Sequence, residues 1–315
     1  MRLTVAPAEE GIALGELLTG RGELPKPVFK AVLAAGGVMV NRHRATRADQ
    51  RLQPRDEVVA HVLARGQRAS GPQPLDPARI LHLDEEIIAI DKPPGIPAQA
   101  TETDVAAGLD ASVRALLAAR GERGQSLGLV HRLDLETSGV TIFGRTPAAV
   151  QSLTDQFREG TVKKTYIALV AGHPDWDDRL VDLPIGADRA HPGLYGVSSQ
   201  GRPARTRFRR VALFGPAGSP LATARLEARP ETGRTHQIRV HALSLGHPLL
   251  GDRRYGGPAA LTSSNGVRLD LPRVALHAAE IRFAHPTRGD LTLSAPWPAD
   301  LTRIEQMLQN GLSAT

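Results

Sequence analysis

The order of hydrophobic and polar positions divides the chain into a short N-terminal unit and a longer, strand-rich unit. Between Gly11 and Val62, ALGELL and the amphipathic helix VFKAVLAAGG, which ends in Gly, precede VMVN and DQRLQPRDEVVAHV, which predict short strands around a turn. The stretch from Ala64 to Ala78, ARGQRASGPQPLDPA, is rich in Gly, Pro and Ser and is typical of a linker.

The longer unit begins at ILHLDEEIIAIDKPPGIP, where two apolar runs flank an acidic turn and Pro93, Pro94 and Gly95 stop the second run. Helices are predicted at ASVRALLAAR and AAVQSLTDQFREG. Strands are predicted at KKTYIALVAGH, LATARLEARP, HQIRVHALSLG, LDLPRVALHAAEIRFAHP and DLTLSAPWP. Helices and strands do not alternate regularly enough for a doubly wound parallel sheet, so we expect an α+β (mixed α/β) domain.

Composition narrows the class of protein. The net charge is +6, and only five of the 39 basic residues are Lys, so most of the positive charge is Arg. Arg suits phosphate and base recognition, although a GC-rich genome would explain the same bias equally well. No apolar run approaches a membrane span, the N-terminus does not resemble a secretory signal, and the chain has no Cys. We therefore expect a cytoplasmic protein without thiolate chemistry.

Two stretches carry candidate chemistry. VHRLDLETSGVTIFG (130–144) places a dense polar group between apolar edges, which indicates an exposed loop that could present Asp134. In 228–257, PETG forms a turn, and the alternation from Gln237 to His241 predicts a half-buried strand with Arg239 opposite Ile238 and Val240. A lone Arg on such a strand is usually solvated, but a carboxylate in a cleft needs a nearby cation to stay ionised.

Other patterns suggest different classes of protein. GQSLG (124–128) fits a serine-hydrolase elbow, but a helix precedes it and a strand follows, which is the reverse of the required order. His236 and His241 are five residues apart and no carboxylate joins them at ligand spacing, so we predict no metal site. A glycoside hydrolase using Asp134 and Glu136 would require a regular strand where TSG indicates a loop.

Several motifs together resemble the RluA family of pseudouridine synthases. HRLDLETSG (131–139) is similar to the signature HRLD-x-x-TSG, and GRTHQIRVH (233–241) and GHPLLGDRRYG (246–256) resemble later motifs of the family. EEIIAIDKPPGIP, KKTYIALVAG and VALHAAEIRFAHP extend the resemblance over about residues 80 to 298. The charged pair often seen after HRLD is replaced here by Leu135 and Glu136.

The resemblance implies an isomerase that detaches, rotates and rejoins uracil without a metal or a nucleotide cofactor. It implies that Asp134 is the catalytic carboxylate, that Tyr166 stacks on the flipped uracil and could relay a proton, and that Arg239 pairs with Asp134. The uridine must leave its RNA context to be rotated. The positions expected to contact RNA are Lys92, Arg132, Lys164, Arg234 and His236.

The N-terminal unit resembles the small RNA-binding module named after the fourth small-subunit ribosomal protein, here called the S4-like module, although Lys26-Pro27-Val28 replaces its usual Ser-Arg opening. We therefore predict an S4-like module (1–63), a linker (64–78), a pseudouridine synthase domain built on largely antiparallel sheet with flanking helices (79–300) and a C-terminal tail or helix (301–315). The expected partner is RNA, with ribosomal RNA favoured over transfer RNA, and the protein is expected to be a monomer without an obligate protein partner. A non-catalytic RNA-binding protein is the remaining alternative.

Overall fold

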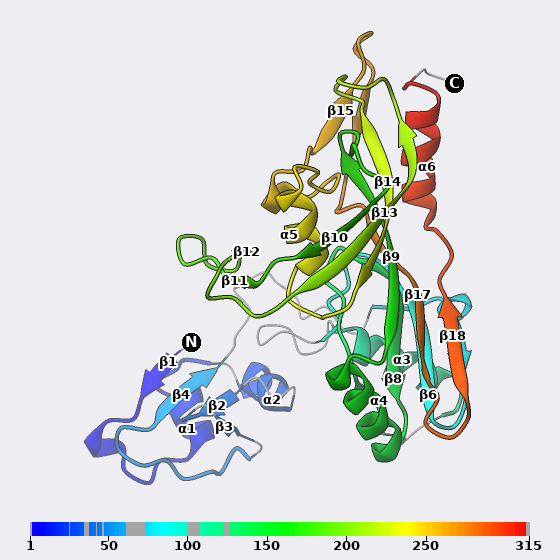
Figure 1. The fold of residues 1–315 in the computed structure, drawn as a ribbon. Helices are drawn as coiled ribbons and strands as arrows, with labels where there is room; N and C mark the ends of the chain where they lie inside the picture. The colour runs from blue at the N-terminus through cyan, green and yellow to red at the C-terminus, as the bar shows by residue number, and fades with distance from the viewer. Residues whose placement is uncertain are drawn as a thin grey trace. The chain divides into compact units, whose positions relative to one another are not determined.

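The computed structural model describes residues 2–24, 26–34, 38–41, 43–45, 47–60, 73–99, 108–122 and 126–312 (Figure 1). Contacts divide the chain into two compact units, Met1–Leu75 with Pro97–Arg123 and Asp76–Ile96 with Gly124–Thr315. Residues 64–72 of the predicted linker and the start of GQSLG, Gly124 and Gln125, lie outside the described residues. The predicted domain boundaries therefore stay a prediction.

The first unit packs short helices on a small antiparallel sheet with strand order β1-β4-β2-β3. Leu14, Leu17 and Leu18 share one face of α1 and are fully buried against Val38 and Val58 of the sheet, a spacing that gives a helix one apolar side. Its described elements are β1 (Arg2–Thr4), η1 (Pro7–Glu9), α1 (Leu14–Thr19), α2 (Lys26–Ala34), β2 (Val38–Val40), β3 (His43–Arg44), β4 (Glu57–Ala60) and α3 (Leu109–Ala119).

The second unit is built on a sheet that has ten strands in the described residues, with the order β10-β13-β14-β9-β17-β8-β6-β5, while β18 pairs with β17 and β7 with β8. The pairs are antiparallel apart from β17 with β8. The mixed α+β class and the mostly antiparallel sheet are thereby confirmed. The strands of this sheet are β5 (Ile80–Leu83), β6 (Ile87–Lys92), β7 (Gly128–Leu129), β8 (Ser138–Gly144), β9 (Lys163–Ala171), β10 (Asp178–Asp182), β13 (Arg205–Phe214), β14 (Thr223–Pro230), β17 (Leu276–Ala284) and β18 (Asp290–Ser294).

Short strand pairs and helices complete the second unit. They are η2 (Pro77–Arg79), α4 (Pro147–Glu159), β11 (Ile185–Ala187), β12 (Tyr195–Val197), α5 (Gln237–Ser244), η3 (Arg253–Tyr255), β15 (Ala260–Thr262), β16 (Arg268–Asp270) and α6 (Ala299–Gln309). No helix in the described ranges is long and apolar enough to cross a membrane.

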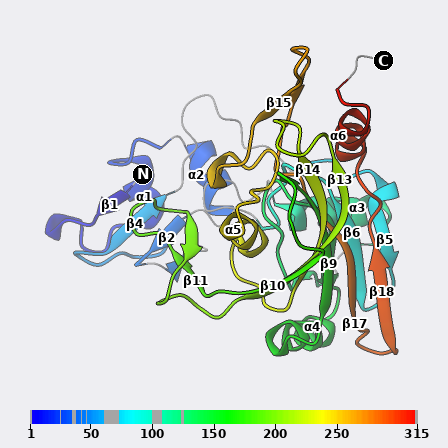
Figure 2. The same ribbon diagram turned by 45° about the horizontal axis from the view of Figure 1, so that its top comes forward.

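The alternation of side chains along β9 gives the sheet two apolar faces. Ala168 and Val170 pack with Ile238 and Ala242 of α5, whereas Leu169 packs with α6. Both views accordingly place α5 and α6 on opposite sides of the β9–β14 region (Figures 1 and 2). Further along the sheet, Leu153 of α4 is buried against β6, β8 and β17.

One row of residues across the sheet brings distant motifs together. Gly139 of β8 and Tyr166 of β9 both pair with Ala278 of β17, which lies between their strands. Gly139 has a φ of +112°, and a Cβ there would collide with the backbone of Ala278. The Gly of TSG therefore allows β17 to approach β8, and this places the start of β8 one strand away from Tyr166.

The strand predicted at HQIRVHALSLG is wrong, because Gln237–Ser244 form helix α5. Apolar and polar residues alternate in this segment, but the alternation does not separate a buried face from an exposed face, because Gln237, Arg239 and His241 are buried as well. Each polar side chain finds an internal partner: Gln237 donates to the carbonyl of Arg205, and Nδ1 of His241 lies 2.9 Å from the hydroxyl of Thr206. A helix buried all round leaves no 3.6-residue pattern to read.

Candidate active site

A cavity of about 470 Å³ opens in the second unit where three parts of the chain converge. It is lined by the loop before β8, by the end of α4 with the start of β9, and by the loop that leads from β14 into α5. The predicted site residues that line it are Arg132, Asp134, Lys164, Tyr166, Arg234, His236 and Arg239. The fold therefore gathers residues that lie up to about a hundred positions apart in the sequence.

Asp134 lies in the loop and keeps 30% of its side chain exposed. Nη1 of Arg239 donates a hydrogen bond to its Oδ2 at 3.2 Å, and Nε2 of His236 lies 3.9 Å from the same oxygen. The carbonyl of Asp134 accepts the N–H of Thr137, which closes a turn over Leu135 and Glu136. The carboxylate is thus presented to the cavity by a tight turn with a cation beside it.

Lys92 fixes the backbone of this turn through hydrogen bonds to carbonyl groups. Its side chain is fully buried, and Nζ donates to the carbonyls of Pro93, Ile96 and Leu135 at 3.0, 2.8 and 3.1 Å. Burial and the charge of Arg273 lower the pKa of Lys92 to about 7. An ammonium with three carbonyl acceptors has no proton left for a phosphate, so this geometry does not fit the predicted RNA contact and instead supports a role in placing the loop.

Arg273 supports the next residue of the same turn and was missed by sequence reasoning. Its Nη1 donates to the carbonyl of Glu136 at 3.1 Å, while Nε and Nη2 bind Asp300 in the first turn of α6. Nothing in the segment LDLPRVALHA distinguishes a buried Arg from a solvated one. Two buried cations therefore fix the two carbonyls that follow Asp134.

Tyr166 is half-buried on β9 and packs against the core shared with α5. Burial, with a contribution from the nearby charge of Asp134, raises the pKa of its hydroxyl well above its usual value. The group is therefore protonated at neutral pH. An uncharged aromatic ring at the wall of a cavity provides a stacking surface for a planar ligand.

Cations outnumber acids around the cavity. Arg132 and Arg202 are exposed and have no ion-pair partner among the described residues, and burial with the charge of Arg234 lowers the pKa of Lys164 to about 8. The basic side chains of the lining are Arg132, Arg158, Lys164, Arg202, Arg234 and Arg239, against the acids Asp134 and Glu231. Such an excess favours a polyanionic ligand.

His131, the first residue of the HRLD motif, serves the structure of the loop. Its Nε2 accepts the N–H of Ile142 at 3.0 Å, and its ring stacks on Phe157 with centroids 4.7 Å apart. Burial lowers the pKa of His131 to about 3, so the imidazole is neutral. It holds the loop to β8 and α4 and is not a second acid or base.

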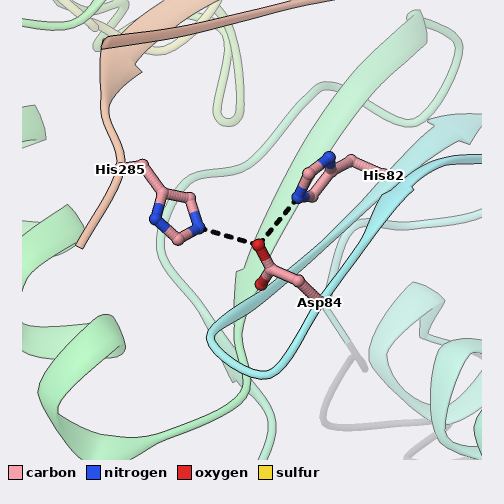
Figure 3. Close-up of side chains that lie close together, drawn as sticks. All are labelled: His82, Asp84 and His285. Atoms are coloured by element: carbon pink, nitrogen blue, oxygen red, sulfur yellow. Dashed lines mark hydrogen bonds and ion pairs between the residues drawn. The ribbon is translucent and has the colours of Figure 1, made fainter. Parts of the chain in front are cut away.

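A separate cluster of His82, Asp84 and His285 was not anticipated from the sequence, and its donor atoms all lie within 4.8 Å of one another (Figure 3). Nε2 of His82 and of His285 lie 2.9 and 3.0 Å from Oδ2 of Asp84. The contact of His82 is a hydrogen bond, whereas Nε2 of His285 is close to the carboxylate without a hydrogen bond. Nδ1 of His285 faces the N–H of Thr287 at 3.3 Å, so the imidazole proton belongs on Nε2, where a metal would have to bind.

The charges around this cluster also disfavour a cation. Arg288 lies 3.7 Å from Oδ2 of Asp84, and Arg145 donates to the carbonyl of Asp84. The arrangement fits a polar clamp, in which the contact of His285 with Asp84 joins the turn after β17 to the turn after β5, better than it fits a metal centre.

Comparisons with known proteins point in one direction. Residues 86–244 match the family described as RNA pseudouridylate synthase. The chain is 33% identical over 318 residues to an uncharacterized RNA pseudouridine synthase of Mycobacterium bovis, covering 96% of this chain and 97% of the relative. It is 34% identical over 297 residues to ribosomal large subunit pseudouridine synthase C of Escherichia coli, covering 91% and 89%. The solved structure of human RNA pseudouridylate synthase domain containing 4 is similar with a TM-score of 0.55 and 25% identity, covering 74% of this chain and 93% of that one.

Proposed function

Because this chain belongs to the RNA pseudouridine synthase family, we propose that it converts specific uridines of large-subunit ribosomal RNA into pseudouridine. The chain is an isomerase that acts on RNA. Large-subunit ribosomal RNA is favoured because relatives from several bacteria are named ribosomal large subunit pseudouridine synthase C or D at 33–38% identity. The same reaction on transfer RNA is the second candidate.

The observation that carries the proposal is the setting of Asp134. Its carboxylate faces a cavity of about 470 Å³ and lies next to the guanidinium of Arg239. Tyr166 lines the same cavity. In the proposed reaction Asp134 acts on the ribosyl carbon or its neighbouring proton, the bond from that carbon to N1 of uracil breaks, and uracil rotates. A bond then forms from the ribosyl carbon to carbon five, which loses its proton while N1 takes one up. Arg239 keeps the carboxylate ionised and oriented.

Tyr166 and the basic rim supply the remaining requirements. A uridine can rotate only after it leaves its stack, which costs a few kcal/mol and favours loops or loosened helices. The ring of Tyr166 offers a surface on which the flipped uracil stacks, and its protonated hydroxyl can donate or relay a proton. Arg132, Lys164, Arg234 and His236 line the rim and are proposed to contact the RNA backbone around the flipped nucleotide.

The first unit is proposed to contribute RNA affinity as an S4-like module. Its described part combines α1 and α2 with a small antiparallel sheet. Of the arginines near its β2–β3 turn, Arg47 pairs with Asp49, and Arg51 donates to the carbonyl of Gly11. Arg42 lies outside the described residues.

Mapping pseudouridines in total RNA from cells with and without this gene tests the proposal. We expect one or more pseudouridines in large-subunit ribosomal RNA to disappear when the gene is deleted and to return with the wild-type gene but not with Asp134→Asn. Loss confined to transfer RNA would favour the second candidate, and an unchanged map would contradict both.

A further inference from the structure

Two residues that the functional assignment does not use, Asp252 and Tyr255, lie in one tight turn around η3. Gly251 and Gly256 bracket it with φ angles of +76° and +73°, and a Cβ on Gly251 would collide with the carbonyl of Arg273. The carbonyl of Asp252 accepts the N–H groups of Tyr255 and Gly257. The turn is thus fixed by its own hydrogen bonds and by the closeness of neighbouring backbone.

Asp252 holds most of the guanidinium of Arg239. Nε of Arg239 donates to Oδ2 of Asp252 at 2.7 Å and Nη2 donates to Oδ1 at 2.8 Å, and the side chains are 6% and 1% exposed. Nη1 is the nitrogen that donates to Asp134, at 3.2 Å. Asp252 thereby occupies the Nε–Nη2 edge of the guanidinium with a two-bond fork and orients Arg239 so that Nη1 meets Asp134 with a single hydrogen bond.

The two carboxylate oxygens of Asp134 differ in their hydrogen bonding. Oδ2 faces Arg239 and His236, whereas Oδ1 has no hydrogen-bond partner in the described part of the chain. A carboxylate oxygen without a donor is the more nucleophilic and more basic one. The orientation that Asp252 gives to Arg239 places the hydrogen bond on Oδ2, and Oδ1 remains available to substrate.

Tyr255 acts on the second neighbour of Asp134. Its hydroxyl accepts the N–H of Tyr195 at 3.0 Å and lies 2.7 Å from Nδ1 of His236. When the hydroxyl donates its proton to Nδ1, the neutral imidazole carries its own proton on Nε2, the atom that faces Asp134. The ring of Tyr255 also lies under the guanidinium of Arg239, 4.8 Å from its central carbon.

We propose that the Asp252–Tyr255 turn is the positioning unit for Asp134: Asp252 orients Arg239 so that one hydrogen bond reaches the carboxylate, and Tyr255 donates its hydroxyl proton to Nδ1 of His236 and so fixes the tautomer of that imidazole. This inference rests on the proposed function, since it assigns the turn to the step that Asp134 performs. Neither residue touches substrate, and both act through side chains that line the cavity.

The test measures single-turnover tritium release from an unmodified large-subunit ribosomal RNA transcript that carries uridine tritiated at carbon five, together with the RNA dissociation constant. Asp252→Asn should lower the maximal rate about 10- to 100-fold, the range expected when a reacting group is misplaced by about an ångström. Tyr255→Phe, which keeps the ring and loses the hydroxyl, should lower it about fivefold. Both variants should bind RNA within about threefold of wild type.

Asp270→Asn is the matched control, because Asp270 forms an Arg–Asp pair with Arg268 on an exposed strand. It should leave both quantities unchanged. If Asp252→Asn does not fold, Tyr255→Phe decides alone. A wild-type maximal rate in the folded variants, or a loss of rate that saturating RNA restores, would overturn the inference while the proposed function stands. An inactive wild-type protein would instead remove the proposed function, and the inference with it.

Discussion

At the scale of single residues, the backbone after Asp134 depends on buried cations. Lys92 holds the carbonyl of Leu135, and Arg273 holds the carbonyl of Glu136. A buried Lys retains its ammonium only while its acceptors compensate for lost hydration. Lys164, at the rim of the cavity, differs from Lys92 because part of its side chain is accessible to solvent, so it can contact RNA.

Lys92→Met separates the two roles considered for Lys92. Removing the three hydrogen bonds should lower the maximal rate at least tenfold, because the turn that carries Asp134 is no longer fixed. The slope of log binding constant against log salt should stay unchanged. A slope reduced by about 0.7–0.9, the value for one lost phosphate contact, would restore the predicted RNA contact.

Lys164 should make RNA binding depend on pH. Its pKa of about 8 lies below the ordinary value, so the ammonium is charged below pH 8 and neutral above it. Raising the pH from 7 to 9 should weaken RNA binding roughly three- to tenfold, the effect of about one phosphate contact. Lys164→Arg keeps its charge over this range and should flatten the profile, and a persisting pH dependence in that variant would exclude Lys164 as its source.

Sequence reasoning at this scale recovered the residues whose side chains face the cavity but not those that hold them. Asp134 stood out because a dense polar group interrupts apolar runs, whereas Tyr166 and Arg239 were singled out by the resemblance of their motifs to the RluA family. Arg273 lies in a segment of ordinary composition, and Asp252 lies in GHPLLGDRRYG, a family-like motif from which no role for this Asp was predicted. Their partners are set by tertiary packing, and no local pattern reports it.

At the scale of elements, strands with clear apolar runs were predicted correctly and α5 was not. β6, β9 and β17 carry apolar runs bounded by Pro, Gly or acidic turns, and their existence follows from that pattern. In α5 internal partners for Gln237, Arg239 and His241 removed the polar face on which a helix prediction depends.

The clamp of His82, Asp84 and His285 should stabilise the turns after β5 and β17. Burial alone would raise the pKa of Asp84, but hydrogen bonds from His82 and from the N–H groups of Ile87 and Glu86 outweigh it and lower the pKa to about 2. Because the pKa is lower in the folded state, the stabilisation is complete above about pH 4 and is lost as the pH falls toward 2.

Asp84→Asn should therefore reduce the free energy of unfolding by about 2 kcal/mol at pH 7, the typical contribution of hydrogen bonds to a buried charged group, and by much less near pH 2. Thermal unfolding across this range measures the difference. Asp290→Asn, which removes an exposed pair with Arg282 on the same hairpin, is the control and should change little. Stabilisation of wild type by added zinc that is lost in Asp84→Asn would instead identify a metal site.

At the scale of the whole molecule, the two compact units suggest that catalysis and additional RNA binding belong to different parts of the chain. The cavity and the residues proposed to act on uridine belong to the second unit, Asp76–Ile96 with Gly124–Thr315. The net charge of +6 and the preference for Arg suit a protein that meets RNA over more than one surface.

Removing residues 1–63 should weaken RNA binding and reduce its salt slope, yet leave the maximal rate at saturating RNA nearly unchanged. Each lost phosphate contact lowers the slope by about 0.7–0.9. The binding constant at several salt concentrations and the single-turnover rate measure these effects. An unchanged affinity and slope would show that the segment does not contact RNA, and a lost maximal rate would show that it helps to build the catalytic unit.

The most direct test of the whole account is the single-turnover rate of Asp134→Asn on an RNA that the wild-type protein modifies. The substitution keeps the size and most contacts of the side chain but removes its charge, and the described cavity lining offers no carboxylate beside Arg239 to replace it. We predict that pseudouridine formation by Asp134→Asn falls below detection while the RNA dissociation constant stays within about threefold of wild type. Appreciable turnover by Asp134→Asn would contradict it.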